Sequence, residues 1–248
     1  MTRGDVGSAL AVLLLLAVAV VADRAARLGQ ARQVFVAGVR AAVQLAVVGV
    51  VIAAVFRTPA LAPLYLAVVL GAASWTSARR LGRRPSLVAV AAAAIGSGAA
   101  CAAAVVFACG ALPLSARTAV PFVAQLVGGA MTATSLAGQR FTDDTHAGWA
   151  EVEGWLAIGA GPAQAVAAMG RRAAARALVP AIDQTRNVGL VVLPGAYVGL
   201  LLGGASPLEA GRIQLLVLVG LLAAETIAAV VVSRLLAPTL GASRPGGG

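Results

Sequence analysis

The sequence contains no lysine, and this absence removes one large class of function. A P-loop needs a lysine after its glycine-rich turn to hold the phosphates of a nucleotide. We therefore expect no conventional ATPase site, no catalytic residue and no bound cofactor on this chain. His146 is its one histidine and no H-E-x-x-H sequence occurs, so a zinc protease is also unsupported. A metal site at His146, Asp143 and Asp144 is an alternative to the simpler interpretation, a solvated loop.

Charged residues are scarce as well, at 11% of the chain, whereas 60% of its 248 residues are hydrophobic. This composition is typical of a polytopic membrane protein, whose first partner is the lipid bilayer. The net charge of +10 comes from arginines that lie between apolar runs. Membrane topology and anionic headgroups explain those arginines better than nucleic acid does, so we expect no nucleic-acid partner. Cys101 and Cys109 would lie about 12 Å apart on a continuous helix, which is too far for a disulfide.

Seven apolar runs are near or above the roughly 17–25 residues that cross a hydrocarbon core. The first run ends near an Ala-Val-Ala sequence that mimics a signal-peptide cleavage site, but the arginines that follow it favour an uncleaved helix. The sequence thus predicts an all-α, polytopic membrane protein with about seven transmembrane helices, forming a single membrane domain over residues 1–248. The predicted spans are Val6–Ala22, Val34–Phe56, Ala60–Ser77, Ser86–Gly110, Thr118–Ala137, Val188–Gly204 and Ala210–Leu236.

The arginines are unequally divided between the two sides of these spans. With the N-terminus outside and the C-terminus inside, fourteen arginines fall on inside segments and four on outside segments, with Arg40 inside a span. Because arginine is retained on the cytoplasmic side, this is the orientation that we predict, in a multi-pass protein of the cell (plasma or inner) membrane. The orientation places residues 138–187 in the cytoplasm, where a soluble motor protein could bind.

Residues 149–204 depart most from membrane composition, and their motifs follow one another in order. Two acids, Glu151 and Glu153, precede a Gly-Ala-Gly-Pro break at residues 159–162, whose glycines free the backbone and whose proline suits a helix start. A basic helix then runs to Pro180, and the next apolar run is interrupted at Pro194 and Gly195. We interpret this stretch as a lever between a soluble partner and the bilayer. An amphipathic surface helix without a partner, followed by a plain proline kink, is the alternative.

Polar residues inside the predicted spans are the candidates for a substrate pathway, because such groups are costly in lipid. Glu225 is the one carboxylate within a span, and it pairs with a polar neighbour, joins an ion path or stays protonated. Bonding of the hydroxyl groups there to carbonyls of the preceding turn is the alternative, and Arg40 is expected to snorkel toward the interface. Broken backbone at membrane depth is tolerated where it lines a cavity. The pathway candidates are Gln44, Gln125, Met131, Thr132, Ser135, Pro194, Gly195 and Glu225.

The chain resembles the FetB (YbbM-type) permeases, which are membrane subunits of ABC transporters associated with iron export and whose plant relatives are linked to aluminium tolerance. The resemblance covers nearly the whole chain and is tightest in LAIGAGPAQA, RRAAARALVPAIDQTRNVGLVVLPG and GLLLGGASPLEAGRIQ, within residues 156–214. The stretch also resembles, more loosely, the E-A-A…G coupling loop of ABC importers. It departs from that loop because Val179-Pro180 comes eight residues later than the expected Leu-Pro ending.

The resemblance implies a permease homodimer bound to a separate ABC ATPase subunit, with ATP and magnesium on that partner and iron export as the transport activity. The residues that would couple to the ATPase are Glu151, Glu153, Gly159, Ala160, Gly161, Pro162, Gln164, Arg171, Arg172 and Arg176. The spans lack clustered metal ligands, so an organic solute such as a nucleotide-sugar is an alternative substrate. A membrane scaffold that anchors a soluble protein without transport is an alternative of another class.

Overall fold

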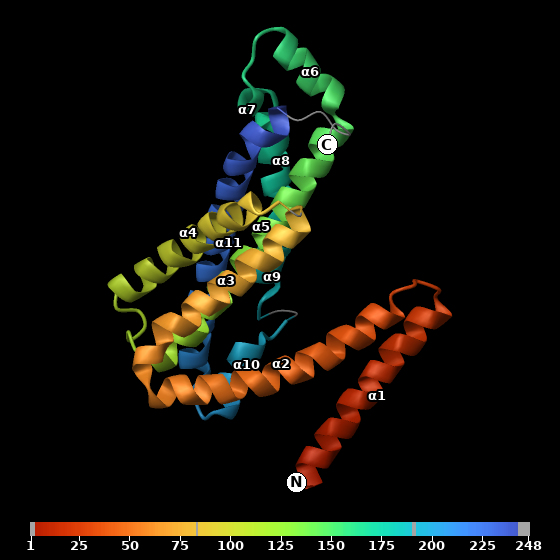
Figure 1. The fold of residues 1–248 in the computed structure, drawn as a ribbon. Coiled ribbons are helices and arrows are strands. Elements are labelled where there is room, and N and C mark those ends of the chain that lie inside the picture. The colour runs from red at the N-terminus through yellow and green to blue at the C-terminus, as the bar shows by residue number, and fades with distance from the viewer. Residues whose placement is uncertain (1–2, 83, 190–191, 243–248) are drawn as a thin grey trace. The chain divides into compact units, whose positions relative to one another are not determined.

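The computed structural model describes residues 3–82, 84–189 and 192–242, and these residues are almost entirely helical (Figure 1). They form two compact units, Met1–Thr58 and Pro59–Gly248. The first unit holds α1 (Arg3–Ala25) and α2 (Ala31–Arg57). The second holds a 3-10 turn (Pro59–Leu61), α3 (Ala62–Leu81), α4 (Ser86–Ala108), α5 (Ala116–Ala147), α6 (Trp149–Ala157), α7 (Pro162–Ala165), α8 (Ala167–Ala177), α9 (Val179–Asn187), α10 (Gly195–Leu202) and α11 (Pro207–Ala242).

The first unit is a hairpin of two apolar helices. Its turn is closed by Asp23, whose carboxylate oxygens accept the backbone N–H of Gln30 at 3.0 and 3.1 Å. That carboxylate is only 5% exposed, and it satisfies a donor at the start of α2 while offsetting the positive end of the helix dipole. Arg27 and Gly29 supply the positive φ values, 54° and 75°, that reverse the chain. The hairpin therefore depends on one buried acid next to a basic turn.

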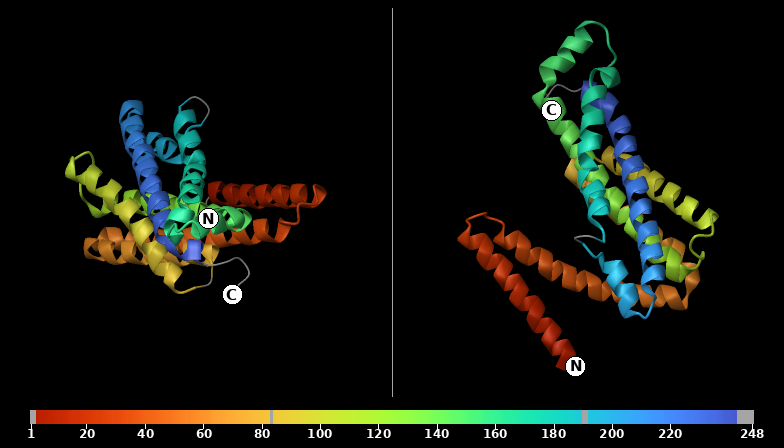
Figure 2. Two further views of the ribbon diagram at one scale, coloured as in Figure 1. Left: turned by 90° about the horizontal axis from the view of Figure 1, so that it is seen from above. Right: turned by 180° about the vertical axis from the view of Figure 1, so that it is seen from behind.

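The core of the second unit is built from α3, α4, α5 and α11, which contact one another (Figure 2). Small residues let these helices approach closely, as is usual within membranes. A Cβ atom at Gly98 of α4 would overlap the carbonyl oxygen of Ala224 on α11. A Cβ atom at Gly220 of α11 would lie 3.3 Å from the ring of Phe122 on α5. Alanine and glycine thus set the spacing of the bundle.

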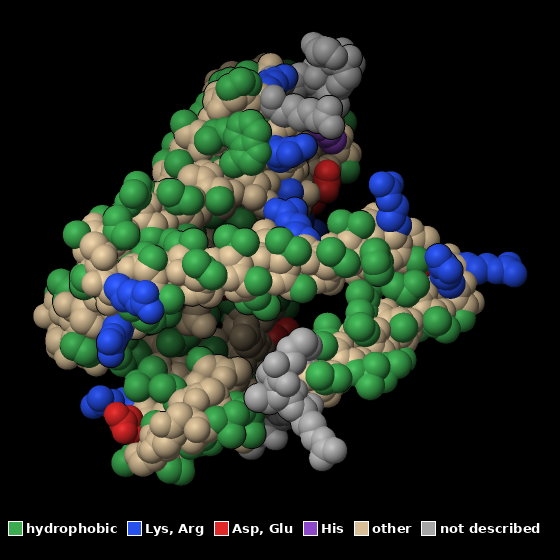
Figure 3. Space-filling model, turned by 60° about the horizontal axis from the view of Figure 1, so that its bottom comes forward, with side chains coloured by type: hydrophobic (Ala, Val, Ile, Leu, Met, Phe, Trp, Pro, Cys, Tyr) green, Lys and Arg blue, Asp and Glu red, His purple; other side chains and the backbone are tan. Residues whose placement is uncertain are grey.

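The exterior is apolar where a membrane protein needs it to be. Side chains such as Leu64 and Val68 on α3, and Leu215 and Val219 on α11, are more than half exposed. Figure 3 shows hydrophobic side chains over much of the visible surface, with the arginines gathered at a few places. Six helices among the described residues are long and apolar enough to cross a membrane: α1, α2, α3 with its preceding turn, α4, α5 and α11. The predicted all-α, polytopic class is confirmed.

The sixth predicted span, Val188–Gly204, is not a continuous helix, so the structure describes six long helices where the sequence predicted seven spans. After α9 the chain forms an isolated bridge between Val188 and Val192, with Gly189 at φ 83°, and α10 is only eight residues long. Pro194 precedes α10 because a proline cannot donate inside a helix but suits its start. Leu190 and Val191, inside this predicted span, lie outside the described residues, as do Arg83 and Arg244 of the arginine count.

Two helices of the second unit are longer than a bilayer core. At a rise of about 1.5 Å per residue, the 32 residues of α5 and the 36 of α11 extend about 48 and 54 Å, against a hydrocarbon thickness of about 30 Å. Both helices contact α8 near their C-terminal ends. Each of these helices is therefore long enough to extend beyond the hydrocarbon at one end.

Candidate functional site

The Gly-Ala-Gly-Pro break forms a tight turn between α6 and α7. Gly159, at φ 91°, donates to the Leu156 carbonyl at 3.0 Å, and Ala160 donates to the Trp155 carbonyl at 3.0 Å, which together end α6. Gly161 then begins α7, and its N–H donates to the side-chain oxygen of Gln164 at 3.0 Å. Each residue of the motif therefore has a role in ending one helix and starting the next.

The same turn lies against the end of the last helix. A Cβ atom at Gly241 of α11 would overlap the main chain of Pro162. Behind the turn, Val166 and Met169 are buried in one core cluster with Phe141 of α5 and Leu236 of α11. The turn, α8 and the ends of α5 and α11 are thus packed together.

The three predicted coupling arginines of α8 differ in their surroundings. Arg176 forms an ion pair with Asp144 of α5, and its carbonyl accepts a hydrogen bond from Arg140. It therefore helps to hold α8 on α5. Arg171 is exposed at the rim of a cavity of about 560 Å³ that lies between α8 and α11. Arg172 is exposed beside a recess of about 430 Å³ that Glu151 also lines.

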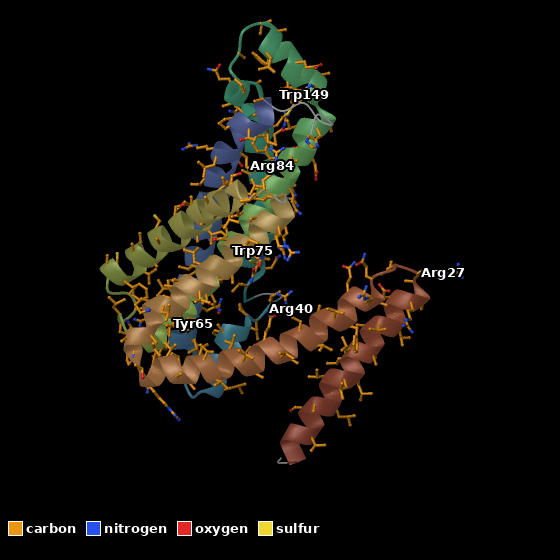
Figure 4. All side chains as sticks on the ribbon, viewed as in Figure 1. Arg27, Arg40, Tyr65, Trp75, Arg84 and Trp149 are labelled. Atoms are coloured by element: carbon orange, nitrogen blue, oxygen red, sulfur yellow. The ribbon has the colours of Figure 1, made fainter. Side chains whose placement is uncertain are left out.

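The tip of α6 carries an exposed surface that sequence reasoning missed. Trp155, on the same short helix as Glu151 and Glu153, is 48% exposed. Ile158, which directly follows that helix and precedes the glycine turn, is 75% exposed. Trp149, labelled in Figure 4 where α5 passes into α6, has a buried indole N–H that finds no partner among the described residues. The sequence contains a signal for this surface. A tryptophan and an isoleucine lie beside a glycine break, in a segment that is otherwise too polar to cross a membrane.

Part of the predicted pathway comes together between α5 and α11. The carboxylate of Glu225 lies over Gly129, where an added Cβ atom would be 2.6 Å from one of its oxygens. Gln125 and Thr132 lie one turn on either side of Gly129 along α5, and both are exposed. The Thr132 hydroxyl donates to the Gly128 carbonyl at 3.2 Å. An acid, an amide and a hydroxyl thus lie along one seam.

Two other predicted pathway residues, Ser135 and Met131, are packed inside the bundle. Ser135 donates to the hydroxyl of Ser77 on α3 at 3.1 Å and also lies 2.9 Å from the Met131 carbonyl. Met131 packs against an apolar core cluster. Thr134 is buried, and its hydroxyl has no partner among the described residues. Ser135 and Met131 therefore join α5 to its neighbours inside the bundle.

The remaining candidates lie elsewhere. Gln44 is exposed on α2 of the first unit, and its participation in the pathway stays a prediction. Arg40, predicted to snorkel toward the interface, is exposed on the same helix. Pro194 and Gly195 begin α10 after the broken backbone. No group of three or more His, Cys, Asp or Glu that could hold a metal ion occurs within the described part of the chain. His146 is exposed near the end of α5.

Long apolar helices, a small-residue bundle and a broken span define a multi-pass membrane protein. Comparison with known proteins agrees: the chain belongs to the Uncharacterised protein family (UPF0014), whose pattern matches residues 6–240. No solved structure matches it.

Several relatives match most of the chain. It is 36% identical over 216 residues to the UPF0014 membrane protein STAR2 of Oryza sativa subsp. japonica, covering 86% of this chain and 76% of the relative. It is 28% identical over 225 residues to the probable iron export permease protein FetB of Escherichia coli (strain K12), covering 88% and 85%. The protein ALUMINUM SENSITIVE 3 of Arabidopsis thaliana is 39% identical over 118 residues, 48% of this chain and 43% of the relative.

Proposed function

We propose that this chain is the permease subunit of an ABC-type transporter, moved by a separate ATPase subunit that binds ATP and magnesium. The observation that carries the proposal is the contact between Gly241 and Pro162, which joins the exposed turn after α6 to the longest membrane helix. A soluble motor that grips this turn would act directly on α11. The similarity to a probable iron export permease supports the transport class.

The surface that the ATPase would grip is the tip of α6. Exposed aromatic and aliphatic side chains, here Trp155 and Ile158, are the residue types that anchor protein interfaces. Glu151, Glu153 and Gln164 border the same tip and would pair with polar groups at the rim. In this proposal the N-terminus lies outside, α6 to α8 lie in the cytoplasm, and two copies of the permease bind two ATPase subunits.

Closure of the nucleotide-loaded ATPase pair would press on α6 and α7. Since the turn, α8 and the end of α11 share one core cluster, they would tilt together. The broken backbone after α9 would bend, so that α6 to α8 and the end of α11 could move relative to the rest of the bundle. This movement would switch access to the pathway. Glu225, Gln125 and Thr132 would face the transported solute in this scheme.

Iron is the first substrate to test, because one relative is named for iron export. An organic solute is the second, because the described residues contain no cluster of typical metal ligands. Cell iron should be measured with and without the gene under iron loading. Higher iron in the strain that lacks the gene supports iron export. Equal iron in both strains would exclude iron as the substrate but would leave the permease proposal standing.

The coupling proposal is tested by co-purification with the ATPase and by its hydrolysis rate. Ile158→Asp should weaken the complex, because it places a charge in the apolar contact. Leu208→Asp, at an 86% exposed position near the start of α11, is the matched control. Equal loss of the ATPase from both variants, or from neither, would count against the α6 surface. A partner that binds the wild type but whose hydrolysis never responds would favour a scaffold.

A further inference from the structure

Helix α9 has one packed face and one polar face. Ala181 is buried, and Ile182 and Thr185 are half-buried on the same side. The Thr185 hydroxyl donates to the Ala181 carbonyl at 2.8 Å and so needs no other partner. At helical spacing, the other side of α9 carries four exposed polar residues: Asp183, Gln184, Arg186 and Asn187.

The position of α9 along α11 is set from both of its ends. Leu178, just before α9, lines the same cavity as Val230 of α11, and beyond α9 the Tyr197 ring lies 4.0 Å from the Cβ position of Gly211. Helix α9 itself contacts α11, which runs in the opposite direction (Figure 2). Asp183 follows Leu178 by five residues, about 7.5 Å along α9. Because α9 runs against α11, Asp183 lies further from the C-terminal end of α11 than this cavity does, on the side of Glu225.

Arginines are typical of the membrane interface, so we take their level in the bundle as the edge of the hydrocarbon. Arg140 of α5 donates to the Arg176 carbonyl, and the neighbouring Gln139 amide lies 3.4 Å from the Arg80 carbonyl of α3. Arg234 of α11 lines the cavity that Leu178 also lines. These residues of four helices lie at similar depth. Helix α9 begins after Arg176 and runs away from this level, toward the middle of α11.

Residues 213–233 of α11, between Arg212 and Arg234, carry Glu225 as their one charge, and they are long and apolar enough to cross the hydrocarbon. The polar face of α9 lies beside this part. Exposed Asp and Arg side chains at that depth cannot face lipid, so they face protein or a water-filled space. The backbone also leaves helical geometry directly after Asn187, which is tolerated at membrane depth where it lines a cavity.

We propose that the polar face of α9 lines the water-filled passage for the transported solute, an inference that rests on the proposed function. The segment 138–187 then divides: α6 to α8 lie in the cytoplasm and α9 lies within the membrane. The face offers carboxylate, amide and guanidinium groups, which suit a hydrogen-bonding organic solute or an organic chelate of a metal. It offers no thiolate or imidazole for a bare transition-metal ion.

The test uses single cysteines in the intact permease with its ATPase. Cys101 and Cys109 are both exposed and are first replaced by alanine. Asp183→Cys and Asn187→Cys are then compared with two references in the same background. Leu215→Cys is a lipid-facing reference on α11, 60% exposed, and Arg172→Cys is an exposed reference on α8. The probe is a charged, water-soluble methanethiosulfonate reagent, which reacts only with thiolates that water reaches.

We expect both α9 cysteines to react at least about tenfold faster than Leu215→Cys, more slowly than Arg172→Cys, and at rates that change when ATP binds. Rates as low as that of Leu215→Cys would overturn the passage, whether lipid or a second copy covers the face. Rates equal to that of Arg172→Cys in every nucleotide state would place α9 in the cytoplasm and overturn it too. Co-purification of the ATPase tests the proposed function separately, since it does not depend on these rates.

Discussion

Gly241 of α11 lies so close to Pro162 that its missing side chain is part of the contact between the last helix and the turn after α6. The atoms that a Cβ would meet belong to the main chain, which no rotamer change can move. The end of α11 and the start of α7 are therefore a single mechanical junction.

Gly241→Val should separate this junction. Inserting atoms into a packed contact costs typically about 1–3 kcal/mol, so we expect a lower midpoint of thermal unfolding in detergent. We also expect ATP hydrolysis by the partner to continue while transport falls. Gly71→Val on α3 is the control, because nothing lies within 4 Å of a Cβ atom at Gly71 and the residue is outside the proposed ATPase contact. Normal transport by Gly241→Val would argue against transmission through this contact.

The hydrogen bond between Ser135 and Ser77 should contribute to the stability of the bundle. It joins α5 to α3 where both side chains are at most 2% exposed. A double-mutant cycle with Ser135→Ala and Ser77→Ala should give a coupling energy of about 0.6 kcal/mol, the average for such bonds within membranes. Transport per folded molecule should stay unchanged, which would remove Ser135 from the pathway residues. Zero coupling would mean that the two serines act independently.

The carboxylate of Glu225 can be moved by a substitution at a neighbouring residue, without mutating Glu225 itself. Gly129→Ala puts a Cβ atom where its carboxylate and the end of Leu221 now lie, and both are flexible side chains that can shift at small cost. We expect a change in stability below about 1 kcal/mol and a clear fall in transport. Gly128→Ala, with nothing within 4 Å of its Cβ position, should leave transport intact and stabilise the helix by about 0.5–1 kcal/mol. Equal transport by the two variants would show that the position of Glu225 is unimportant.

Local pattern predicted the features that depend on neighbouring residues. Six of the seven apolar runs form long helices, the glycine turn separates two helices, and Pro194 with Gly195 lies at a real break. The sixth span was predicted because residues 188–204 are apolar enough, whereas glycine and proline prevent one helix from spanning them.

The contacts that arrange the candidate site join residues far apart in the chain. Gly129 with Glu225 and Gly241 with Pro162 are pairs of this kind. Nothing in the sequence around one residue of a pair indicates which residue it contacts. The exposed tip at Trp155 and Ile158 was missed for a related reason. Only packing reveals that Val152 is fully buried while Trp155, less than one turn further along α6, stays exposed.

Substitutions at Gly159 and Gly161 distinguish the effect of backbone conformation from that of side-chain volume at the coupling turn. Gly159 has φ 91° and open space around its Cβ position, whereas Gly161 has φ −69° and meets only the Gln164 oxygen at 3.7 Å. Gly159→Ala should thus strain the turn by about 1–2 kcal/mol, while Gly161→Ala should be tolerated. Because Gly159 ends the helix that carries Trp155 and Ile158, its replacement should reorient the exposed tip.

The measurements are the ATPase rate and transport of the assembled complex. We expect Gly159→Ala to lower the ratio of solute moved to ATP hydrolysed, with Gly161→Ala close to the wild type. If the two alanines lowered this ratio equally, steric bulk rather than backbone conformation would control the turn. If neither alanine lowered this ratio, α6 would not be the element through which the ATPase acts, because a changed end of α6 would then leave transport unaffected.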